Sequence, residues 1–466
     1  MLFNLCAYKD STAVISDRGE RYSYGELNAM QQNLSVLLKQ GRLAFCLCNN
    51  TVGSLVGYLS FIQNHVPAVM LDGEKDIEII NGLIDIYQPQ YLWIPENRDS
   101  EFEGKTLIKQ DGYLLIERKT IQYEIHPAIA LLLTTSGSTG SPKLVKLTLQ
   151  NLQSNADSIV QYLDITSEER PITSLPMYYS YGLSVINSHL VKGATILLTD
   201  KTVIQKEFWT FAKEMEATSI AGVPYTYEML RRLRIFRMDL PSLKTMTQAG
   251  GKLNAKIAEE YIRNAEETGR RFFVMYGQTE ATARMSYLPQ ERAIEKYDSI
   301  GIAIPGGSFS LIDGDGGDIT EPDVDGELIY KGSNVSMGYA ECIADLSKGD
   351  ENNGVLHTGD IGHRDVDGYY YITGRMKRFV KIWGNRCNLD AIEQLVKTIT
   401  VNCACVGVDD LITVFVTEPG LDTEIKNFLS EKTGLNIRAF TVKVINAIPK
   451  SPTGKLLYSE LQKLIN

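Results

Sequence analysis

The strongest constraint on the fold is an alternation of short apolar runs with segments of helical period. From about residue 43 the runs AFCLC, PAVMLD and YLWIP are separated by GSLVGYLSFIQ and KDIEIINGLIDIY, whose apolar residues recur every three or four positions. The alternation resumes after residue 128 and continues to FFVMY, which ends at Tyr276. This pattern is typical of βαβ units, so it predicts a large α/β body with mostly parallel sheets.

The pattern of apolar and polar residues changes after Asp298 and again after Gly374. In 313–332 short apolar runs are separated by Gly, Asp and Pro, which favours hairpins over crossover helices. After Gly374 a compact α+β pattern follows, with helices expected from Leu389, Asp422 and Lys455. We therefore expect a large N-terminal domain over 1–374, with the α/β body to about 297 and a β-rich lobe over about 298–374, and a small mobile α+β domain over 375–466.

Size and charge exclude several classes of protein. With 466 residues, 44% of them hydrophobic, the chain can bury more than one core, unlike a small binding module. It has no run of about 18 uncharged apolar residues and no basic stretch followed by a long apolar run at its start. We expect a cytoplasmic protein without a membrane span. The net charge of −10 disfavours nucleic acid as a partner.

The charge is unevenly distributed. From Arg375 onward the sequence holds 13 Lys and Arg against 9 Asp and Glu, a balance of +4. The remainder of the chain is therefore strongly acidic. This basic C-terminal part predicts an anionic partner.

Cysteine, histidine and an acidic Gly-rich stretch offer little support for a metal or redox site. Cys46/Cys48 and Cys403/Cys405 lie in alternating apolar runs, where core thiols are expected. The five His residues lack the spacing of zinc ligands. The stretch 313–318 suggests a calcium loop, but Gly317 occupies the third ligand position of an EF-hand, so solvated turns are favoured.

The most specific motif is TTSGSTGSPK at 134–143, directly after the apolar run AIALLL. A strand followed by a loop of Gly, Ser and Thr that ends in Lys is a phosphate-binding pattern, because small residues let backbone N–H groups approach oxyanions. The spacing does not fit a Walker A loop, which disfavours a P-loop kinase or ATPase. The expected nucleotide-binding residues in this motif are Thr135, Ser136, Gly137, Ser138, Thr139, Gly140 and Lys143.

With this motif the sequence resembles the adenylate-forming superfamily, which includes acyl-CoA synthetases, nonribosomal-peptide adenylation domains and firefly luciferase. The resemblance covers nearly the whole chain and rests on eight segments in the order typical of the family. They are TTSGSTGSPK (134–143), LPMYYSYGL (175–183), QAGGKL (248–253), MYGQTEAT (275–282), GELIYKGSNVSMGY (326–339), HTGDIGHRDVDGYYYITGR (357–375), KIWGNRCNLDAIE (381–393) and PKSPTGK (449–455).

The resemblance implies a role for individual residues. Thr279 and Glu280 match the positions that hold the α-phosphate and Mg²⁺, a cation that prefers carboxylate and phosphate oxygens. Asp360 matches the acid that accepts the ribose hydroxyls, and Arg375 supports the ribose or a phosphate. Lys455 matches the adenylation lysine, whose ammonium offsets the repulsion between a carboxylate and the α-phosphate. The residues implied for the nucleotide site also include Gly250, Gly251, Tyr276, Gly277 and Gln278.

Beyond Arg375 the resemblance implies a second half-reaction. Lys377 matches the hinge of the small C-terminal domain. Lys381 and Gly384 match the segment that admits a pantetheine arm. Trp383 could line that path or cap the core of the domain, and the sequence leaves both alternatives open.

The sequence departs from the family pattern in LPMYYSYGL. Acyl-CoA synthetases usually carry a His where Tyr179 stands, and peptide-synthetase domains for α-amino acids carry a nearby Asp. Without an acid at 178–181, an α-amino acid would bury an unpaired ammonium, so we expect an acid that lacks a free α-amine. The residues that resemble the lining of the acyl pocket, with core packing as the alternative, are Tyr179, Tyr181, Val185, Val223 and Tyr225.

These observations predict an ATP- and Mg²⁺-dependent acid–thiol ligase. It would activate a carboxylic acid as acyl-AMP with release of pyrophosphate, and transfer the acyl group to coenzyme A or to the phosphopantetheine of an acyl or peptidyl carrier protein. An amide ligase shares every adenylation motif and stays open as an alternative. A non-catalytic nucleotide-binding regulator is a further alternative, against which Lys455, Glu280 and Asp360 speak.

Overall fold

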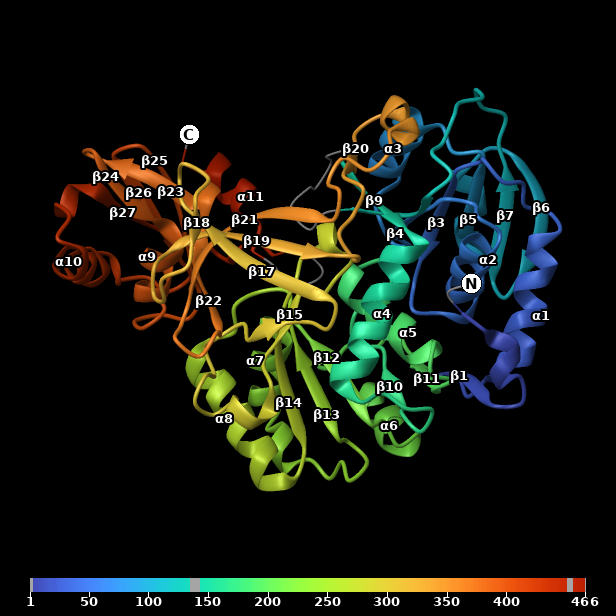
Figure 1. Ribbon diagram of the computed structural model, residues 1–466, viewed down its shortest axis with the longest axis horizontal. Helices are drawn as coiled ribbons and strands as arrows, with labels where there is room; N and C mark the ends of the chain where they lie inside the picture. Colours follow the sequence, from blue (N-terminus) through green and yellow to red (C-terminus); the bar gives the residue numbers. More distant parts are fainter. Residues whose placement is uncertain (1–2, 135–142, 451–455, 466) are drawn as a thin grey trace. The chain divides into compact units, whose positions relative to one another are not determined.

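The computed structural model describes residues 3–134, 143–450 and 456–465 (Figure 1). The chain divides into two compact units. Unit 1 comprises Met1–Ser308 and Lys331–Leu356, and unit 2 comprises Phe309–Tyr330 and His357–Asn466. This division groups part of the β-rich segment with the C-terminal residues, and the boundary expected between 374 and 375 stays a prediction.

The first sheet of unit 1 confirms the parallel arrangement predicted from the βαβ pattern. The described strands follow the order β16-β15-β14-β13-β12-β10-β11-β1-β2, and all neighbours from β14 to β1 pair in parallel. β1 comes from the start of the chain, yet its Val14 pairs with Ile196 of β11. The strands are β1 (Thr12–Ser16), β2 (Arg21–Ser23), β10 (Pro171–Ile172), β11 (Ile196–Leu198), β12 (Ser219–Gly222), β13 (Thr245–Gln248), β14 (Arg271–Tyr276), β15 (Ser286–Tyr287) and β16 (Ile302–Ala303).

The second sheet of unit 1 has the order β20-β9-β8-β4-β3-β5-β7-β6 among the described strands. Its centre, β8-β4-β3-β5, is parallel and built from runs that are almost entirely buried, as expected for strands covered on both faces. The strands are β3 (Ala44–Cys48), β4 (Ala68–Asp72), β5 (Tyr91–Pro95), β6 (Lys105–Gln110), β7 (Tyr113–Glu117), β8 (Ile129–Thr134), β9 (Leu144–Thr148) and β20 (Tyr339–Ala340).

Helices separate the two sheets of unit 1, as Figure 1 shows for α4 and α5. Every residue of α5 is buried, and its Leu183 and Ile186 pack in one core with strand residues from both sheets. Such a helix, buried on all sides, must lie between layers. The helices of this unit are α1 (Tyr24–Ser35), α2 (Val52–Gln63), α3 (Ile77–Tyr87), α4 (Leu149–Leu163), α5 (Ser180–Leu190), α6 (Lys206–Glu214), α7 (Pro224–Arg232) and α8 (Ala255–Thr268).

Unit 2 contains a sheet of order β18-β17-β19-β21-β22 and a smaller sheet, β25-β26-β27, whose core includes side chains of α9 and α10. The last described helix, α11, begins at Tyr458, three residues after the expected start. The elements are β17 (Gly307–Ile312), β18 (Asp318–Ile319), β19 (Gly326–Gly332), β21 (Val355–Arg364), β22 (Tyr370–Arg375), β23 (Phe379–Ile382), β24 (Asn385–Asn388), α9 (Leu389–Val396), β25 (Cys403–Val408), β26 (Leu411–Val416), α10 (Asp422–Thr433), β27 (Phe440–Val444) and α11 (Tyr458–Lys463).

Three sequence interpretations bear on cofactors and location. The thiols of Cys46, Cys48, Cys403 and Cys405 are buried and free of disulfides, which confirms them as core thiols. Among the described residues no group of three or more His, Cys, Asp or Glu could hold a metal ion. Within the same residues no helix has both the length and the apolar character needed to cross a membrane.

Candidate active site

The centre of the candidate site is the loop that follows β14. The loop passes through a short 3-10 helix, Thr279–Ala281, and returns as β15, so that Tyr276 pairs with Ser286. The turn requires glycine at 277, because a Cβ there would lie 1.8 Å from the carbonyl oxygen of Ala283. In parallel sheets ligands bind at the carboxyl ends of strands, and this loop lies at such an end.

Thr279 and the rest of the loop are held from two directions. The Thr279 Oγ1 lies 3.1 Å from the Oγ of Ser180, the first residue of α5. Asn334 donates from Nδ2 to the carbonyl oxygens of Ala281 and Arg284 at 2.9 and 3.0 Å. These buried hydrogen bonds fix the path of the backbone on both sides of Glu280.

Glu280 is held by Tyr339, a residue that the sequence analysis did not single out. The Tyr339 hydroxyl donates to Glu280 Oε1 at 2.8 Å, and the Lys143 ammonium lies 3.6 Å from the centre of the Tyr339 ring. Burial and the Glu280 carboxylate raise the pKa of Tyr339, so its hydroxyl remains a donor at neutral pH. Lys143, at the end of the phosphate-binding motif, and Glu280, the expected metal ligand, therefore both contact the Tyr339 side chain.

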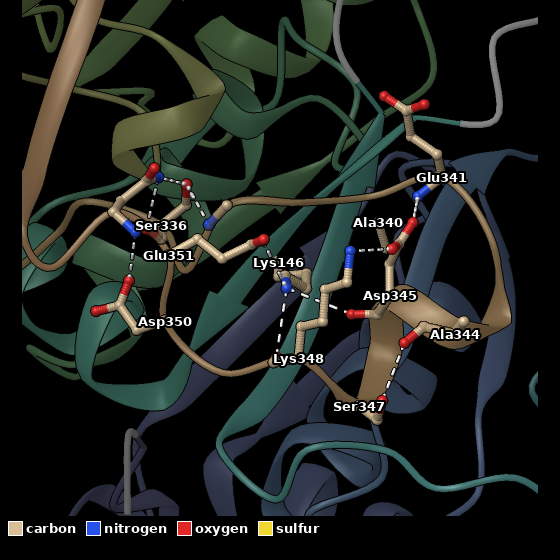
Figure 2. Close-up of polar contacts among 12 residues, drawn as sticks. Lys146, Ser336, Ala340, Glu341, Ala344, Asp345, Ser347, Lys348, Asp350 and Glu351 are labelled. Carbon is tan, nitrogen blue, oxygen red and sulfur yellow. Dashed lines mark hydrogen bonds and ion pairs between the residues drawn. The ribbon is translucent and has the colours of Figure 1, made fainter.

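Tyr339 is positioned by the pairing of β20 with β9, in which it lies opposite Val145. Lys146 of β9 binds the segment that follows β20, and Figure 2 shows these contacts. The Lys146 side chain is wholly buried. The Lys146 Nζ lies 3.3 Å from Glu351 Oε2 and 3.3 Å from the carbonyl oxygens of Asp345 and Lys348. Lys146 thus supports the strand that carries Tyr339.

Replacing Lys146 with Met should destabilise unit 1 by about 1 to 3 kcal/mol, because two carbonyl oxygens lose their buried donor. Urea denaturation of the purified variant would measure the change. Lys348→Met is the matched control: it breaks the 2.7 Å pair between the half-exposed Lys348 and Asp345, and should cost clearly less stability than Lys146→Met. Equal losses for both variants would contradict the anchoring role of Lys146.

Two of the residues expected in the nucleotide site, Gly250 and Gly251, follow β13, the strand beside β14. Gly250 has φ +82°, a conformation that favours glycine, and Gln248 Nε2 donates to the Gly251 carbonyl oxygen at 2.9 Å. Gln278 Nε2 donates to the Tyr276 hydroxyl at 3.2 Å. Because β13 and β14 are parallel neighbours, both loops lie at the same edge of the sheet.

Four of the five residues expected in the acyl pocket share one buried cluster: Tyr179, Tyr181, Val185 and Val223. Tyr225, at the start of α7, is 41% exposed and lies outside that cluster. The Tyr181 hydroxyl donates to the Thr247 carbonyl oxygen at 2.8 Å. Pocket lining and core packing both remain compatible with this cluster.

In unit 2, Asp360 and Arg375 are opposite one another on β21 and β22. The Arg375 Nε lies 2.9 Å from the buried carboxylate of Asp360, so the two predicted ribose-site residues form an ion pair. Lys377 lies in the short segment Met376–Arg378 that leads from β22 to β23, and its hinge role stays a prediction.

Lys381 and Gly384 belong to the hairpin of β23 and β24. Gly384 has φ +88° and open space where a Cβ would stand. The neighbouring Trp383 is 52% exposed, and both alternatives for its ring stay open. The predicted residues Thr135, Ser136, Gly137, Ser138, Thr139, Gly140 and Lys455 lie outside the described residues.

A family model described as AMP-binding enzyme matches residues 4–340. The chain belongs to this family. The resemblance to the adenylate-forming superfamily drawn from the eight motifs is thereby confirmed.

Individual relatives of this chain include a feruloyl-CoA synthase from Amycolatopsis sp, 30% identical over 293 residues, which are 60% of this chain and 57% of that protein. The chain thus spans less than two thirds of that relative. A 2-succinylbenzoate–CoA ligase from Bacillus cytotoxicus is 26% identical over 93% of this chain and 89% of its own. The fold matches an O-succinylbenzoate coenzyme A synthetase from Bacillus subtilis in complex with AMP, with a TM-score of 0.80 at 22% identity, covering 99% of this chain and 97% of that one.

Two residues near the candidate site, Tyr339 and Asp72, were not identified from the sequence. Tyr339 ends the quoted segment GELIYKGSNVSMGY, so its place in a motif was a signal that could have been used. Asp72 accepts a hydrogen bond from the Tyr178 hydroxyl at 3.0 Å, which brings an acid from β4 to the segment 178–181. No local pattern links Asp72 to that segment, because the two are 106 positions apart.

Proposed function

We propose that this chain is an ATP- and Mg²⁺-dependent acid–thiol ligase that forms an acyl-adenylate and pyrophosphate before it transfers the acyl group to a thiol. The observation that carries the proposal is the arrangement of Lys143, Tyr339 and Glu280. A half-buried carboxylate at a strand end, oriented by a tyrosine and close to a lysine, suits a metal ion bound to nucleotide phosphates. The ion would supply charge neutralisation at the triphosphate.

The remaining residues act on the nucleotide and the acid. Thr279 can donate its hydroxyl to the α-phosphate, and the Asp360 carboxylate, oriented by Arg375, can accept the ribose hydroxyls. Lys455 would offset the repulsion between the two approaching anions. The acyl carboxylate then displaces pyrophosphate from the α-phosphorus.

The acid is proposed to lack a free α-amine. The buried cluster around Tyr181 already holds a cation, the guanidinium of Arg284, whose Cζ lies 5.0 Å from the centre of the Tyr181 ring. A substrate ammonium in the same low-dielectric region would be repelled by Arg284. Asp72 already accepts a hydrogen bond from the Tyr178 hydroxyl, and ATP–pyrophosphate exchange with amino acids tests whether it also pairs with a substrate ammonium.

The acyl acceptor is proposed to be coenzyme A or a carrier-protein phosphopantetheine. The names of the feruloyl-CoA and 2-succinylbenzoate–CoA relatives favour coenzyme A. The net +4 charge from Arg375 onward suits the phosphates of coenzyme A and an acidic carrier protein alike, so transfer should weaken as salt rises. A cytoplasmic location stays a prediction.

Replacing Gly384 with Leu should block thioester formation by roughly two orders of magnitude or more while pyrophosphate exchange stays within a few-fold of wild type, because the new side chain would enter the proposed pantetheine path. The two half-reactions are measured separately, by exchange and by thioester yield. Gly420→Leu is the matched control, since Gly420 has φ +87°, equally open surroundings and a place in the same unit. Equal impairment by both variants would assign the loss to backbone strain.

The proposed function is tested by incubating the protein with ATP, Mg²⁺ and a panel of fatty, hydroxy, aromatic and amino acids, and following ATP–pyrophosphate exchange. Thioester formation is then measured with coenzyme A and with a phosphopantetheinylated carrier protein, and amide formation with amines. Exchange followed by thioester formation supports the proposal. Exchange followed only by amide formation supports the amide-ligase alternative, and strong turnover with an α-amino acid alone contradicts the substrate proposal.

A further inference from the structure

Arg284 is a buried cation without an acidic partner. Its side chain is 2% exposed, and it is among the largest wholly enclosed side chains of the described residues. Its Nη1 donates to the Tyr162 hydroxyl at 3.0 Å, but its Nε is buried with no hydrogen-bond partner, and no carboxylate of the described residues forms an ion pair with it. A buried charge left uncompensated in this way is costly, so an anion supplied from outside the chain would be strongly favoured.

Arg284 is one of the residues that line a cavity of about 20 Å³. Val185, which also belongs to the predicted acyl cluster, lines the same cavity, together with Thr247, the residue that accepts the Tyr181 hydroxyl. A volume of this size exceeds the roughly 10 to 15 Å³ that one water requires, so a compact polar group fits where a long alkyl chain does not.

None of the other titratable groups that line the cavity forms an ion pair with Arg284. Burial, together with the Arg284 charge, lowers the pKa of His189 to about 4, so its ring is neutral at pH 7. Glu169 accepts a hydrogen bond from the Thr218 hydroxyl, and Arg271 is paired with Asp164 at 3.3 Å. Of the four side chains, those of His189, Glu169, Arg271 and Arg284, only that of Arg284 is charged and has a buried N–H group without a hydrogen-bond acceptor.

We propose that the acid carries a second carboxylate, and that Arg284 binds it inside the acyl pocket. The inference rests on the proposed function and names its substrate class as a short dicarboxylic acid. One carboxylate attacks the α-phosphorus of ATP, so that a P–O bond forms and pyrophosphate leaves. The other carboxylate accepts charge-assisted hydrogen bonds from Arg284 and is unchanged by the reaction.

The first test compares acids of equal chain length that differ in the distal carboxylate. Succinate is paired with butanoate, glutarate with pentanoate, and phthalate with benzoate, and each acid is assayed by ATP–pyrophosphate exchange. The dicarboxylic member of at least one pair should give a kcat/KM roughly 10- to 100-fold higher than its partner. Equal or lower turnover of the dicarboxylic acids in every pair would overturn the inference while the proposed function stood.

The second test is Arg284→Met, which replaces the guanidinium by an apolar side chain of similar length. The preference for the dicarboxylic acid should disappear, so that the two members of each pair give similar kcat/KM values. Arg284→Lys keeps the charge and should retain part of the preference, which decides the matter if the Met variant does not fold. Arg263→Met, which removes an exposed pair with Glu259 on α8, is the matched control and should preserve the wild-type preference. An unchanged preference in the Met or Lys variant would overturn the inference.

A binding measurement separates this inference from the proposed function. If no acid supports exchange, the ligase proposal fails, and succinate, glutarate and phthalate are then titrated by calorimetry into wild type and Arg284→Met. Binding that requires Arg284 supports the anion site independently of catalysis. Binding that ignores the substitution, or no binding at all, overturns it.

Discussion

Lys455→Ala is expected to slow acid-dependent ATP–pyrophosphate exchange by roughly two to four orders of magnitude. The variant removes an ammonium that would lie near both the carboxylate and the α-phosphate, so the repulsion between them rises as they approach. Transfer from a synthetic acyl-adenylate to the thiol should remain near the wild-type rate, because the carboxylate is by then already activated.

The control for this variant is Lys450→Ala, which changes another lysine of the same PKSPTGK segment. It should leave both half-reactions within a few-fold of wild type. An exchange rate for Lys455→Ala that matches the control would remove Lys455 from the chemistry. Loss of both half-reactions would instead point to a structural role for the segment.

Glu280→Gln is expected to lower pyrophosphate exchange by roughly two to three orders of magnitude and to raise the Mg²⁺ concentration needed for half-maximal rate. Gln retains an oxygen that can accept the Tyr339 hydroxyl, so the hydrogen bond of 2.8 Å can persist while the charge is lost. Kinetics over a Mg²⁺ titration measure both effects.

Glu341→Gln provides the matched comparison, because the Glu341 carboxylate also lies near Lys143, at 3.8 Å, but is 63% exposed. Its removal should change the Mg²⁺ dependence by less than a few-fold. If the two variants responded alike, the metal role would not belong to Glu280 in particular.

Most elements were predictable because the local signals are strong. Helix α10 begins at Asp422, and β3, β4 and β5 fall on the apolar runs that predicted them. Parallel pairing followed from the alternation of these runs with helices. The sheet to which a strand belongs was not predictable, because β1 pairs on one side with β2, its neighbour in sequence, but on the other side with β11, which is distant in sequence.

The site was predictable where a motif holds its residues together and unpredictable where distant segments meet. Thr279 and Glu280 lie in one loop, as the motif indicated, whereas the Tyr339 hydroxyl reaches Glu280 across 59 positions. Arg284 resembles any charged loop residue in the sequence. Its burial depends on Tyr162, which is 122 positions away, and no periodicity signals such an enclosure.

The distance between β1 and β11 along the chain also affects how the protein emerges from a ribosome. Val14 of β1 cannot pair with Ile196 until roughly 180 further residues have been synthesised. At a translation rate of 5 to 20 residues per second this interval lasts roughly 10 to 40 s. During that time the nascent strand TAVIS has only β2 as a neighbour and presents an apolar edge to other chains. Slower translation of residues 17–196 should therefore increase aggregation of the newly made protein, although the finished fold would be unaltered.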